Sequence, residues 1–591
     1  MEKQYNQKRQ DLYREERKLL QRSRLFLLGK LFSFIVAAIF AYWSYTNFSY
    51  LNLLVCVVMA VWYLSLCKVD AMCIGKIRRL KSMQHVCENE IACLKGDFTP
   101  FDDGSRYTDY KHAYSYDLDV FGKTSLYQRL NRTITSDGSD RLARKLTVLP
   151  EEKTEILENQ EAIEELAGMH DWRIRFLSNT PVDQLPEGLG QTLANGKNKN
   201  RWATSTLPFV LIAFTLICFL LAAFGVMAWQ WFSTLFTIQI IVTVICSKNS
   251  SHASMKVEKL HQVFSGYLYI LKDIHDADFQ SAKLKRLKQQ LFAADANSLE
   301  AFRELSGILN LFDQRGNVIM YVLLNGMILF DWMLLRRFVK WGERYLSSMD
   351  AWIACIAEVD ALTSLGTYAA NHPTNHRAEL LDEEAEILVE AKDFYHPFLP
   401  YEKAVPNDYV LNKHTVSIVT GANMAGKSTF LRTVGVSYIM ACCGLPVCAS
   451  SFRFSLVSLF SSMRTTDDLA NDISYFNAEL LRLKQLIQHV KSHRFTLIIL
   501  DEILKGTNSR DKLKGSMMFL QEITRYPVSA IIATHDLELS KLEEQDGKTY
   551  QNYCFEIALS DEIEYSYKIK RGVAQNLNAS YLLANILESL Q

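Results

Sequence analysis

The sequence predicts an α/β domain at the C-terminal end of a chain that is otherwise all-helical, with two uncharged hairpins inserted into the helical part. Three observations support this prediction. From about residue 380 onward, apolar runs of strand length alternate with helical segments. Charged and apolar residues recur at helical spacing over residues 117–175 and again over 251–370. Two long stretches, 31–67 and 202–247, contain no charged residue.

The uncharged stretches have the length of paired transmembrane helices. Residues 31–67 leave room for two helices of about 18 residues, the lower end of what spans a bilayer, with a turn at 46–49. Residues 202–247 divide in the same way near 225–231. Lys and Arg flank both stretches, and residues 1–30 hold nine of them. By the positive-inside rule we expect an integral membrane protein with four spans and both termini in the cytoplasm.

A further apolar run at residues 318–335 is expected to be different. It contains Asp331, and an acid in the middle of a membrane costs roughly 2.5–3.5 kcal/mol on insertion scales. A fifth span would also put the C-terminal domain on the outer side of the membrane. We therefore expect this run to form a buried helix of the soluble part.

The most specific motif begins the C-terminal domain. Residues 421–429 read Gly-Ala-Asn-Met-Ala-Gly-Lys-Ser-Thr, with the P-loop spacing at Gly421, Gly426, Lys427 and Ser428. The motif stands between an expected strand at 415–420 and an expected helix at 430–441, where backbone N–H groups and a helix N-terminus can bind a polyphosphate. Lys427 would reach the β/γ-phosphates and Ser428 would ligate Mg²⁺. The sequence thus predicts ATP and Mg²⁺ as cofactors, with no other metal.

Two later strand ends carry the residues that such a site requires. The apolar run 495–501 ends at Asp501, and Glu502 follows directly. We expect Asp501 to hold Mg²⁺ through its water shell and Glu502 to act as general base toward the attacking water. Another apolar run, 528–534, precedes His535, which can sense the γ-phosphate as a neutral hydrogen-bonding group.

Overall composition excludes some functions and leaves others open. The chain has 65 basic and 65 acidic residues, so there is no global attraction to nucleic acid or to anionic lipid. Basic helix faces within 283–288 and 336–340 leave local contact with nucleic acid open, although a solvated helix face explains most such runs. None of the twelve cysteines forms a Cys-x-x-Cys pair, which argues against zinc or redox chemistry.

At these residues the sequence resembles a known family. Residues 420–429, 500–507 and 533–539 resemble the P-loop, Walker B and His-switch segments of the MutS mismatch-repair ATPases. Residues 465–479 are similar to the family's signature region. Residues 396–397 and 406–408 match the family's entry into its ATPase domain, and residues 121–135 have a more moderate similarity to the start of its helical core.

The resemblance implies more than the motifs themselves. Proteins of this family belong to the ABC class and dimerise, so Ser474 would contact the γ-phosphate bound by the partner subunit. Asn423 and Met424 match P-loop residues that shape the phosphate pocket. Ala422 and Ala425 replace the usual proline and glycine of the P-loop, and 504–505 reads Leu-Lys in place of Gly-Arg.

Larger departures concern DNA. No domain for reading mismatches precedes residue 116, where a basic segment and an uncharged hairpin stand instead. The second hairpin occupies the place of the family's DNA-encircling helices. The expected fold is therefore an ABC-class P-loop ATPase domain preceded by an all-α MutS-like core that two transmembrane hairpins interrupt.

The expected segments follow from these boundaries. They are a basic N-terminal segment (1–30), hairpin 1 (31–67), a helical connector (68–115), the first part of the helical core (116–200), hairpin 2 (202–247), the second part of the core (248–378) and the ATPase domain (379–591).

Two further functions remain as alternatives to a membrane-anchored, homodimeric MutS-like ATPase acting on DNA or another partner. An ABC-class transporter would also join membrane spans to a nucleotide domain, but the Leu-Ser-Gly-Gly-Gln signature is absent. An ATP-gated membrane scaffold would not need Glu502, because a sensor needs no general base.

Overall fold

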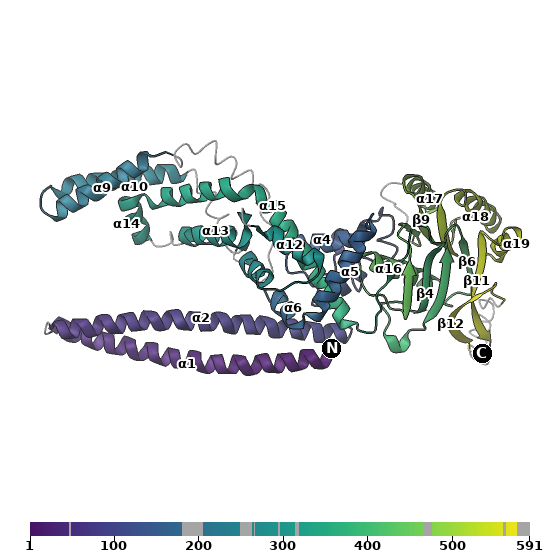
Figure 1. Cartoon of the computed structure of the whole chain (residues 1–591), viewed down its shortest axis with the longest axis horizontal. Coiled ribbons are helices and arrows are strands. Elements are labelled where there is room, and N and C mark those ends of the chain that lie inside the picture. Colours follow the sequence, from purple (N-terminus) through teal and green to yellow (C-terminus); the bar gives the residue numbers. More distant parts are fainter. Residues whose placement is uncertain are drawn as a thin grey trace, which may run out of the picture.

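The computed structural model describes residues 1–46, 49–179, 205–248, 263–264, 266–293, 296–313, 318–464, 475–559 and 563–575. The molecule is elongated (Figure 1). Apolar helices extend to one end of it, an α/β domain forms the other end, and a helical core lies between them.

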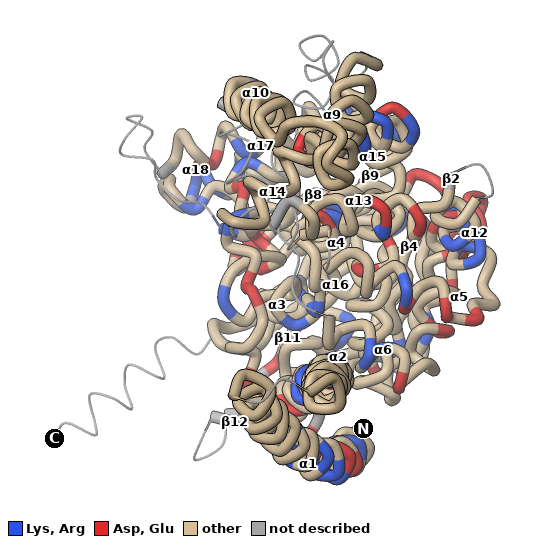
Figure 2. The backbone as a smooth tube through the Cα atoms, turned by 90° about the vertical axis from the view of Figure 1, so that its left-hand side faces the viewer, with Lys and Arg blue, Asp and Glu red and all other residues tan. Residues whose placement is uncertain are grey.

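The N-terminal third of the molecule begins with a long helical hairpin. Helix α1 (Glu2–Thr46) and helix α2 (Tyr50–Leu94) have 45 residues each, so the basic segment and most of the expected connector continue the helices of the hairpin. The base of the hairpin is packed, where Tyr5, Leu12 and Cys87 are buried against Ile174 of the helical core. Figure 2 shows that the charged residues of α1 gather toward its N-terminal end.

The helical core confirms the prediction of helices and adds detail that periodicity missed. Residues 117–125 form turns before the first helix, and a two-stranded pair, β1 (Phe292–Ala293) with β2 (Ala296–Asn297), interrupts the second part. The core helices include α3 (Leu126–Leu130), α4 (Ser136–Thr147), α5 (Lys153–Gly168), α6 (His170–Leu177), α12 (Ala282–Leu291), α13 (Ser298–Asp313) and the 42-residue α15 (Phe330–Asn371), and residues 266–275 are also helical.

The second uncharged stretch forms two shorter helices, α9 (Leu207–Ala223) and α10 (Trp229–Lys248), joined by a turn at a left-handed Gly225. Of the described helices, α1 and α2 are the two that are each long and apolar enough to cross a membrane, while α9 and α10 are apolar but shorter. A four-span topology therefore stays a prediction.

The prediction of one buried helix at residues 318–335 is wrong. The run instead breaks into α14 (Val318–Ile328) and the start of α15, which meet at 78° around a left-handed Leu329. The side chain of Asn325 accepts a hydrogen bond from the backbone N–H of Asp331, so Asp331 lies in the first turn of α15 and not within one continuous helix. Val318 and Ile319 are each 73% exposed.

The C-terminal domain is built on a six-stranded sheet with the order β12-β11-β6-β10-β9-β8. All neighbours are parallel except the β11–β12 pair. The strands are β6 (Val416–Gly421), β8 (Ser458–Ser462), β9 (Thr496–Asp501), β10 (Val528–Ala533), β11 (Tyr550–Leu559) and β12 (Ile563–Arg571). The main helices are α16 (Lys427–Cys442), α17 (Tyr475–Ser492) and α18 (Ser509–Ile523), followed by the short α19 (Leu542–Gln545).

A second, four-stranded sheet lies beside the first, in the order β3-β7-β4-β5. Its strands are β3 (Glu379–Leu380), β4 (Ile387–Phe394), β5 (Asn407–Asn412) and β7 (Ser451–Phe454). The expected strands at 415–420, 495–501 and 528–534 thus appear within one residue of their predicted ends. This accuracy follows from their composition, because short, continuous apolar runs bounded by polar residues suit fully buried parallel strands.

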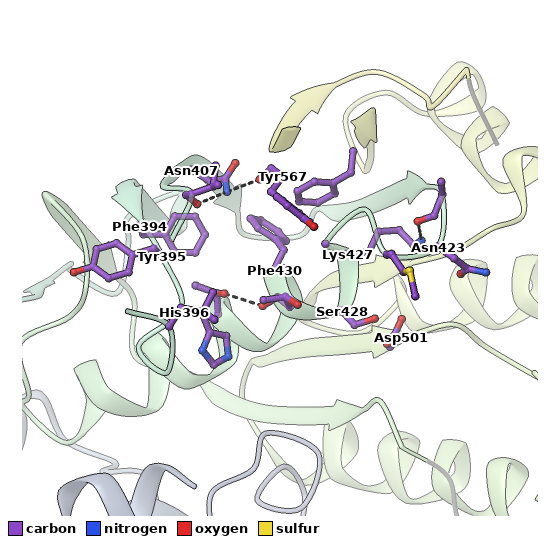
Figure 3. Close-up of a pocket in the computed structure, with 18 of the residues that line it drawn as sticks. Phe394, Tyr395, His396, Asn407, Asn423, Lys427, Ser428, Phe430, Asp501 and Tyr567 are labelled. Carbon is purple, nitrogen blue, oxygen red and sulfur yellow. Dashed lines mark hydrogen bonds between the residues drawn. The ribbon is translucent and has the colours of Figure 1, made fainter. Parts of the chain in front are cut away.

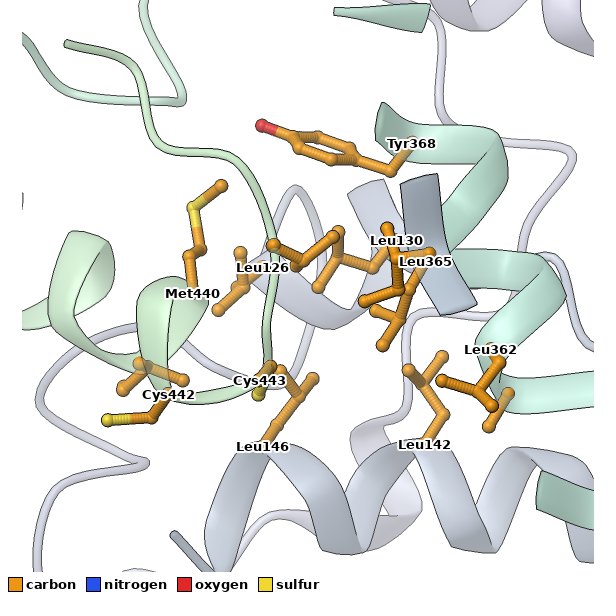
Figure 4. Packing of buried hydrophobic residues seen from close by; sticks show 14 of the residues in the cluster. Leu126, Leu130, Leu142, Leu146, Leu362, Leu365, Tyr368, Met440, Cys442 and Cys443 are labelled. Atoms are coloured by element: carbon orange, nitrogen blue, oxygen red, sulfur yellow. The ribbon is translucent and has the colours of Figure 1, made fainter. Parts of the chain in front are cut away.

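The helical core and the α/β domain share one hydrophobic core. The C-terminal end of α16 packs against α3, α4 and α15, as Figure 4 shows for Met440, Cys442 and Cys443 beside Leu126 and Leu146. The Cys443 thiol also donates a hydrogen bond to the carbonyl of Lys145. The helix that follows the P-loop is therefore fixed in the helical core at its far end.

Candidate active site

The candidate site lies where three neighbouring parallel strands end. Strand β6 leads into the P-loop, β9 ends at Asp501, and β10 ends two residues before His535. Because parallel strands present their carboxyl ends at one edge, this edge is where an open α/β sheet binds ligands. A pocket of about 720 Å³ opens there (Figure 3). The predicted site residues that line it are Asn423, Met424, Gly426, Lys427, Ser428, Thr429, Asp501, Glu502 and His535.

The conformation of the P-loop explains its glycines. Gly421 has φ 149° and Gly426 has φ 108°, and Met424 between them is also left-handed with φ 64°. A Cβ atom on Gly421 would lie 2.8 Å from the carbonyl oxygen of Phe555 on β11, which is too close. Gly426 is the N-cap of α16, whose first-turn N–H groups have no partner within the helix. Left-handed turns beside a helix N-terminus make a concave anion site.

Lys427 provides a buried positive charge at the pocket. It is buried, and its ammonium donates hydrogen bonds of 2.8 Å to the carbonyls of both Gly421 and Ala422. It also lies 3.4 Å from Nε2 of His535. Burial lowers the pKa of Lys427 to about 8, while Asp501 and Glu502 act in the opposite direction. The side chain is therefore mainly protonated at neutral pH and can neutralise phosphate charge.

Ser428 and Asp501 supply the oxygen ligands that a hard cation needs. Figure 3 shows their side chains pointing toward each other at the pocket floor. In the part of the chain that the structure describes, no group of three His, Cys, Asp or Glu residues is arranged to hold a metal alone. A hydroxyl and one carboxylate fit Mg²⁺, which uses few protein ligands together with phosphate and water oxygens.

Glu502 is positioned for proton transfer. It is left-handed with φ 63°, a strained conformation of the kind found at functional sites. Its Oε1 lies 3.5 Å from Nε2 of His535, and its Oε2 accepts a hydrogen bond of 2.8 Å from Lys512. Burial alone would raise the pKa of Glu502, but the ammonium of Lys512 outweighs it and the pKa is lowered. Glu502 is ionised at neutral pH.

His535 lies between Glu502 and the P-loop lysine, with its Nε2 within 3.5 Å of both side chains. Burial, followed by the charge of Lys427, lowers the pKa of His535 below its ordinary value. The imidazole is therefore neutral at neutral pH and can donate or accept a hydrogen bond, as the sequence predicts. Ser474 lies outside the described residues, so its expected contact with a partner subunit stays a prediction.

Sequence reasoning missed two residues at this site. Lys512 lies in the first turn of α18, ten residues after Glu502. The separation of the two residues in the sequence does not predict their contact, because the intervening loop determines where α18 begins. Glu479 on α17 accepts hydrogen bonds of 3.0 Å from the backbone N–H groups of Lys505 and Gly506. Glu479 thereby connects the end of the signature-like segment to the loop that follows Glu502.

The Leu-Lys substitution at 504–505 also has a structural consequence. Leu504 is buried in a left-handed conformation with φ 57°, which glycine would adopt without strain. The side chain of Leu504 packs against Gly515 of α18, where a Cβ atom would lie 2.5 Å from it. The leucine therefore ties the loop after the Walker B strand to α18.

Aromatic side chains form the opposite wall of the pocket. They come from four separate parts of the chain, so no single sequence motif predicts that they share one site. These residues are Phe394, Tyr395, His396, Phe430, Phe555 and Tyr567. Flat apolar faces of this kind suit a planar ring.

Comparison with known proteins decides the family of this domain. A model of MutS domain V matches residues 417–584. This part of the chain is a MutS-like domain. The match includes every predicted site residue of the MutS-like domain, from Gly421 to His535.

Pairwise similarity to individual proteins supports the same assignment of this domain. The chain is 33% identical over 231 residues to the DNA mismatch repair protein MutS of Acetivibrio thermocellus, which is 37% of this chain and 26% of that protein. It is 31% identical over 200 residues to a probable DNA mismatch repair protein Msh6 of Drosophila melanogaster, covering 33% and 17%. A MutS of Clostridium botulinum is 31% identical over 245 residues, covering 39% and 25%. The similarity thus spans about a quarter or less of the length of these relatives.

Proposed function

We propose that this MutS-like protein is a membrane-anchored ATPase that couples ATP binding and hydrolysis to a conformational switch of a homodimer. The arrangement of Lys427, Asp501, Glu502 and His535 at the ends of three adjacent strands carries the proposal. Together they provide a cation that binds phosphate, a metal ligand, an ionised general base and a neutral hydrogen-bonding group in one pocket.

Each of these side chains has a distinct role in the proposed reaction. Lys427 and the P-loop N–H groups bind and orient the β/γ-phosphates. Ser428 and Asp501 would hold Mg²⁺, which would neutralise charge on the phosphates. Glu502 accepts the proton of the attacking water, and His535 orients that water through its neutral imidazole. The aromatic wall stacks on the adenine ring.

Contacts outside the pocket support coupling to the helical core. Asp119, in the turns that precede α3, binds Arg432 of α16 at 3.0 Å and Arg464 at 2.6 Å. Arg464 comes directly before residues 465–479, the signature-like segment that contains Ser474. One carboxylate of the core therefore joins the P-loop helix to the start of that segment. A shift of either would be passed to the helical core through Asp119 and the packed end of α16.

Membrane anchoring rests on the exposure of the first hairpin. The most apolar 18-residue windows of α1 and α2 have 6% and 0% of their residues buried. Lys30 and Asp70 form an ion pair at the base of this apolar part, and Ser23 also donates a hydrogen bond to Asp70. The pair marks where the hairpin would leave the hydrocarbon on the cytoplasmic side, because charged groups are costly inside it.

DNA binding is proposed from the relatives, which are named as DNA mismatch repair proteins, and dimerisation is proposed from the resemblance to the MutS ATPases. DNA contact is tested by measuring the affinity for matched, mismatched and branched duplexes over a range of salt concentrations. Binding that weakens with salt would show phosphate contacts, whereas a flat response would contradict them. Equal affinity for matched and mismatched duplex would leave DNA binding without mismatch recognition.

Replacing the general base tests the catalytic proposal directly. Glu502→Gln keeps the size of the side chain but cannot accept a proton, so we expect turnover to fall by about 10²–10⁴-fold while ATP binding persists. The measurement pairs steady-state phosphate release with binding of a fluorescent ATP analogue. Normal turnover in this variant would refute the role of Glu502.

A further inference from the structure

We propose that α14 is an in-plane membrane helix, lying at the boundary between headgroups and hydrocarbon of an anionic bilayer, beside the two apolar hairpins. The proposal rests on the membrane anchoring proposed above and adds a third contact. It also replaces the sequence-based expectation that residues 318–335 are buried in the soluble part.

Composition and exposure of α14 do not fit a soluble helix. Its 11 residues, Val-Ile-Met-Tyr-Val-Leu-Leu-Asn-Gly-Met-Ile, contain no charge, and only Asn325 and Gly326 are buried. Val318, Ile319 and Leu323 are 73%, 73% and 49% exposed. A helix that is apolar on all sides belongs in a protein core or in a membrane, and α14 lies outside the core.

The position of α14 matches that of the apolar hairpins. Figure 1 shows α14 with α9 and α10 at the same end of the molecule as the turn between α1 and α2. Figure 2, which looks onto that end, shows α9, α10 and α14 above the first hairpin. Gly326 of α14 packs closely on α10, because a Cβ atom there would lie 2.3 Å from the ring of Phe236.

Length and angle determine how α14 would lie. A helix of 11 residues is roughly 16 Å long, about half of the hydrocarbon thickness of a bilayer, so it cannot span. It meets α15 at 78°, and α15 leaves in the direction of the hairpin helices (Figure 1). With the hairpins crossing the bilayer, α14 lies across their direction and parallel to the membrane surface.

Polar groups at the start of α15 define the boundary. Trp332 packs edge-on against Phe209 of α9 at 4.8 Å, and Arg336 lies over the Phe209 ring and donates a hydrogen bond to the carbonyl of Ser205. Arg337 and Lys340 are exposed within three turns of the break. Trp332 is itself buried, whereas exposed basic residues just beyond an apolar segment are typical of the headgroup region, and these cations would attract anionic lipid.

Photocrosslinking of the full-length chain in liposomes of phosphatidylcholine and phosphatidylglycerol tests the proposal. A diazirine amino acid is placed singly at Ile319 of α14, at Leu53 of the first hairpin, or at Leu157 of the helical core. These side chains are 73%, 45% and 43% exposed, so all three probes are accessible. Lipid adducts are then quantified by mass spectrometry.

We expect adducts of similar yield at Ile319 and Leu53, and none at Leu157. An adduct at Leu53 without one at Ile319, or a crosslink from Ile319 to a second protein chain, would overturn the α14 proposal while leaving the anchor intact. Absence of lipid adducts at both Leu53 and Ile319 would overturn membrane anchoring itself. Replacing Arg337 and Lys340 together by Gln is expected to remove the dependence of the Ile319 adduct on phosphatidylglycerol, and an unchanged dependence would contradict the headgroup contact.

Discussion

The ammonium of Lys512 lies 2.8 Å from Oε2 of Glu502, and this ion pair determines how the proposed general base is held. Lys512 is only 16% exposed and also lies 3.9 Å from Asp536, beside His535. The opposite oxygen of Glu502 faces His535. Lys512 therefore orients one carboxylate oxygen toward itself and leaves the other for the water and the imidazole.

Removing Lys512 should shift the pH dependence of hydrolysis. Its charge lowers the pKa of Glu502, so Lys512→Met should raise that pKa. A base with a raised pKa becomes protonated at higher pH as the solution is acidified. The acidic limb of the kcat profile should therefore move to higher pH. Lys512→Arg should retain the wild-type limb.

Lys514 provides the matched control for this experiment. It lies on the same helix and is exposed, so Lys514→Met removes an equal charge without touching Glu502. An acidic limb that moves equally in the Lys512→Met and Lys514→Met variants would show a general charge effect and exclude a specific role for the ion pair.

A composite site should be rescued by mixing two inactive variants. If Ser474 contacts the γ-phosphate bound by the partner subunit, Lys427→Ala and Ser474→Ala should each lose ATPase activity. Mixed dimers would then contain one site with an intact lysine and an intact serine. We expect activity to return on mixing, measured as phosphate release after subunit exchange. A mixture as inactive as its components would argue against the shared site.

A buried charge cluster in the helical core should be highly sensitive to mutation. Glu358 forms ion pairs of 2.7 Å with both Lys145 and Lys283, and it also forms an ion pair with Arg141. Glu358→Gln leaves buried cations without a counter-charge and should lower the free energy of unfolding by about 3–5 kcal/mol. Chemical denaturation of purified protein in detergent measures this loss.

Two comparisons make the Glu358 result specific. Glu522 pairs with Arg525 at the surface, and Glu522→Gln should cost less than about 1 kcal/mol. The cations outweigh burial and hold the pKa of Glu358 well below its usual range. The stabilisation by Glu358 is therefore present above the ordinary glutamate pKa and is lost only in strong acid, as pH falls through the lowered value. Equal losses in the two variants at neutral pH would contradict the assignment.

Much of the α/β domain could be predicted because its signals are local. The P-loop needs glycines at two left-handed positions, and Asp501 and His535 lie at or just after the ends of short apolar strands bounded by polar residues. Local sequence carried less information in the helical part. The pair β1–β2 and the break at Leu329 both depend on a few residues inside segments whose spacing is helical.

The sequence by itself determined the motif residues, the order of the strands along the chain and the uncharged hairpins, since each is recorded in neighbouring residues. Only the tertiary structure decided that Lys512 pairs with Glu502, that Glu479 holds the loop after the Walker B strand, and that α14 turns its apolar side chains outward. The physical reason is that these features depend on where one element stops and another packs. Side chains that are far apart in the sequence come into contact there, and no local sequence pattern predicts these contacts.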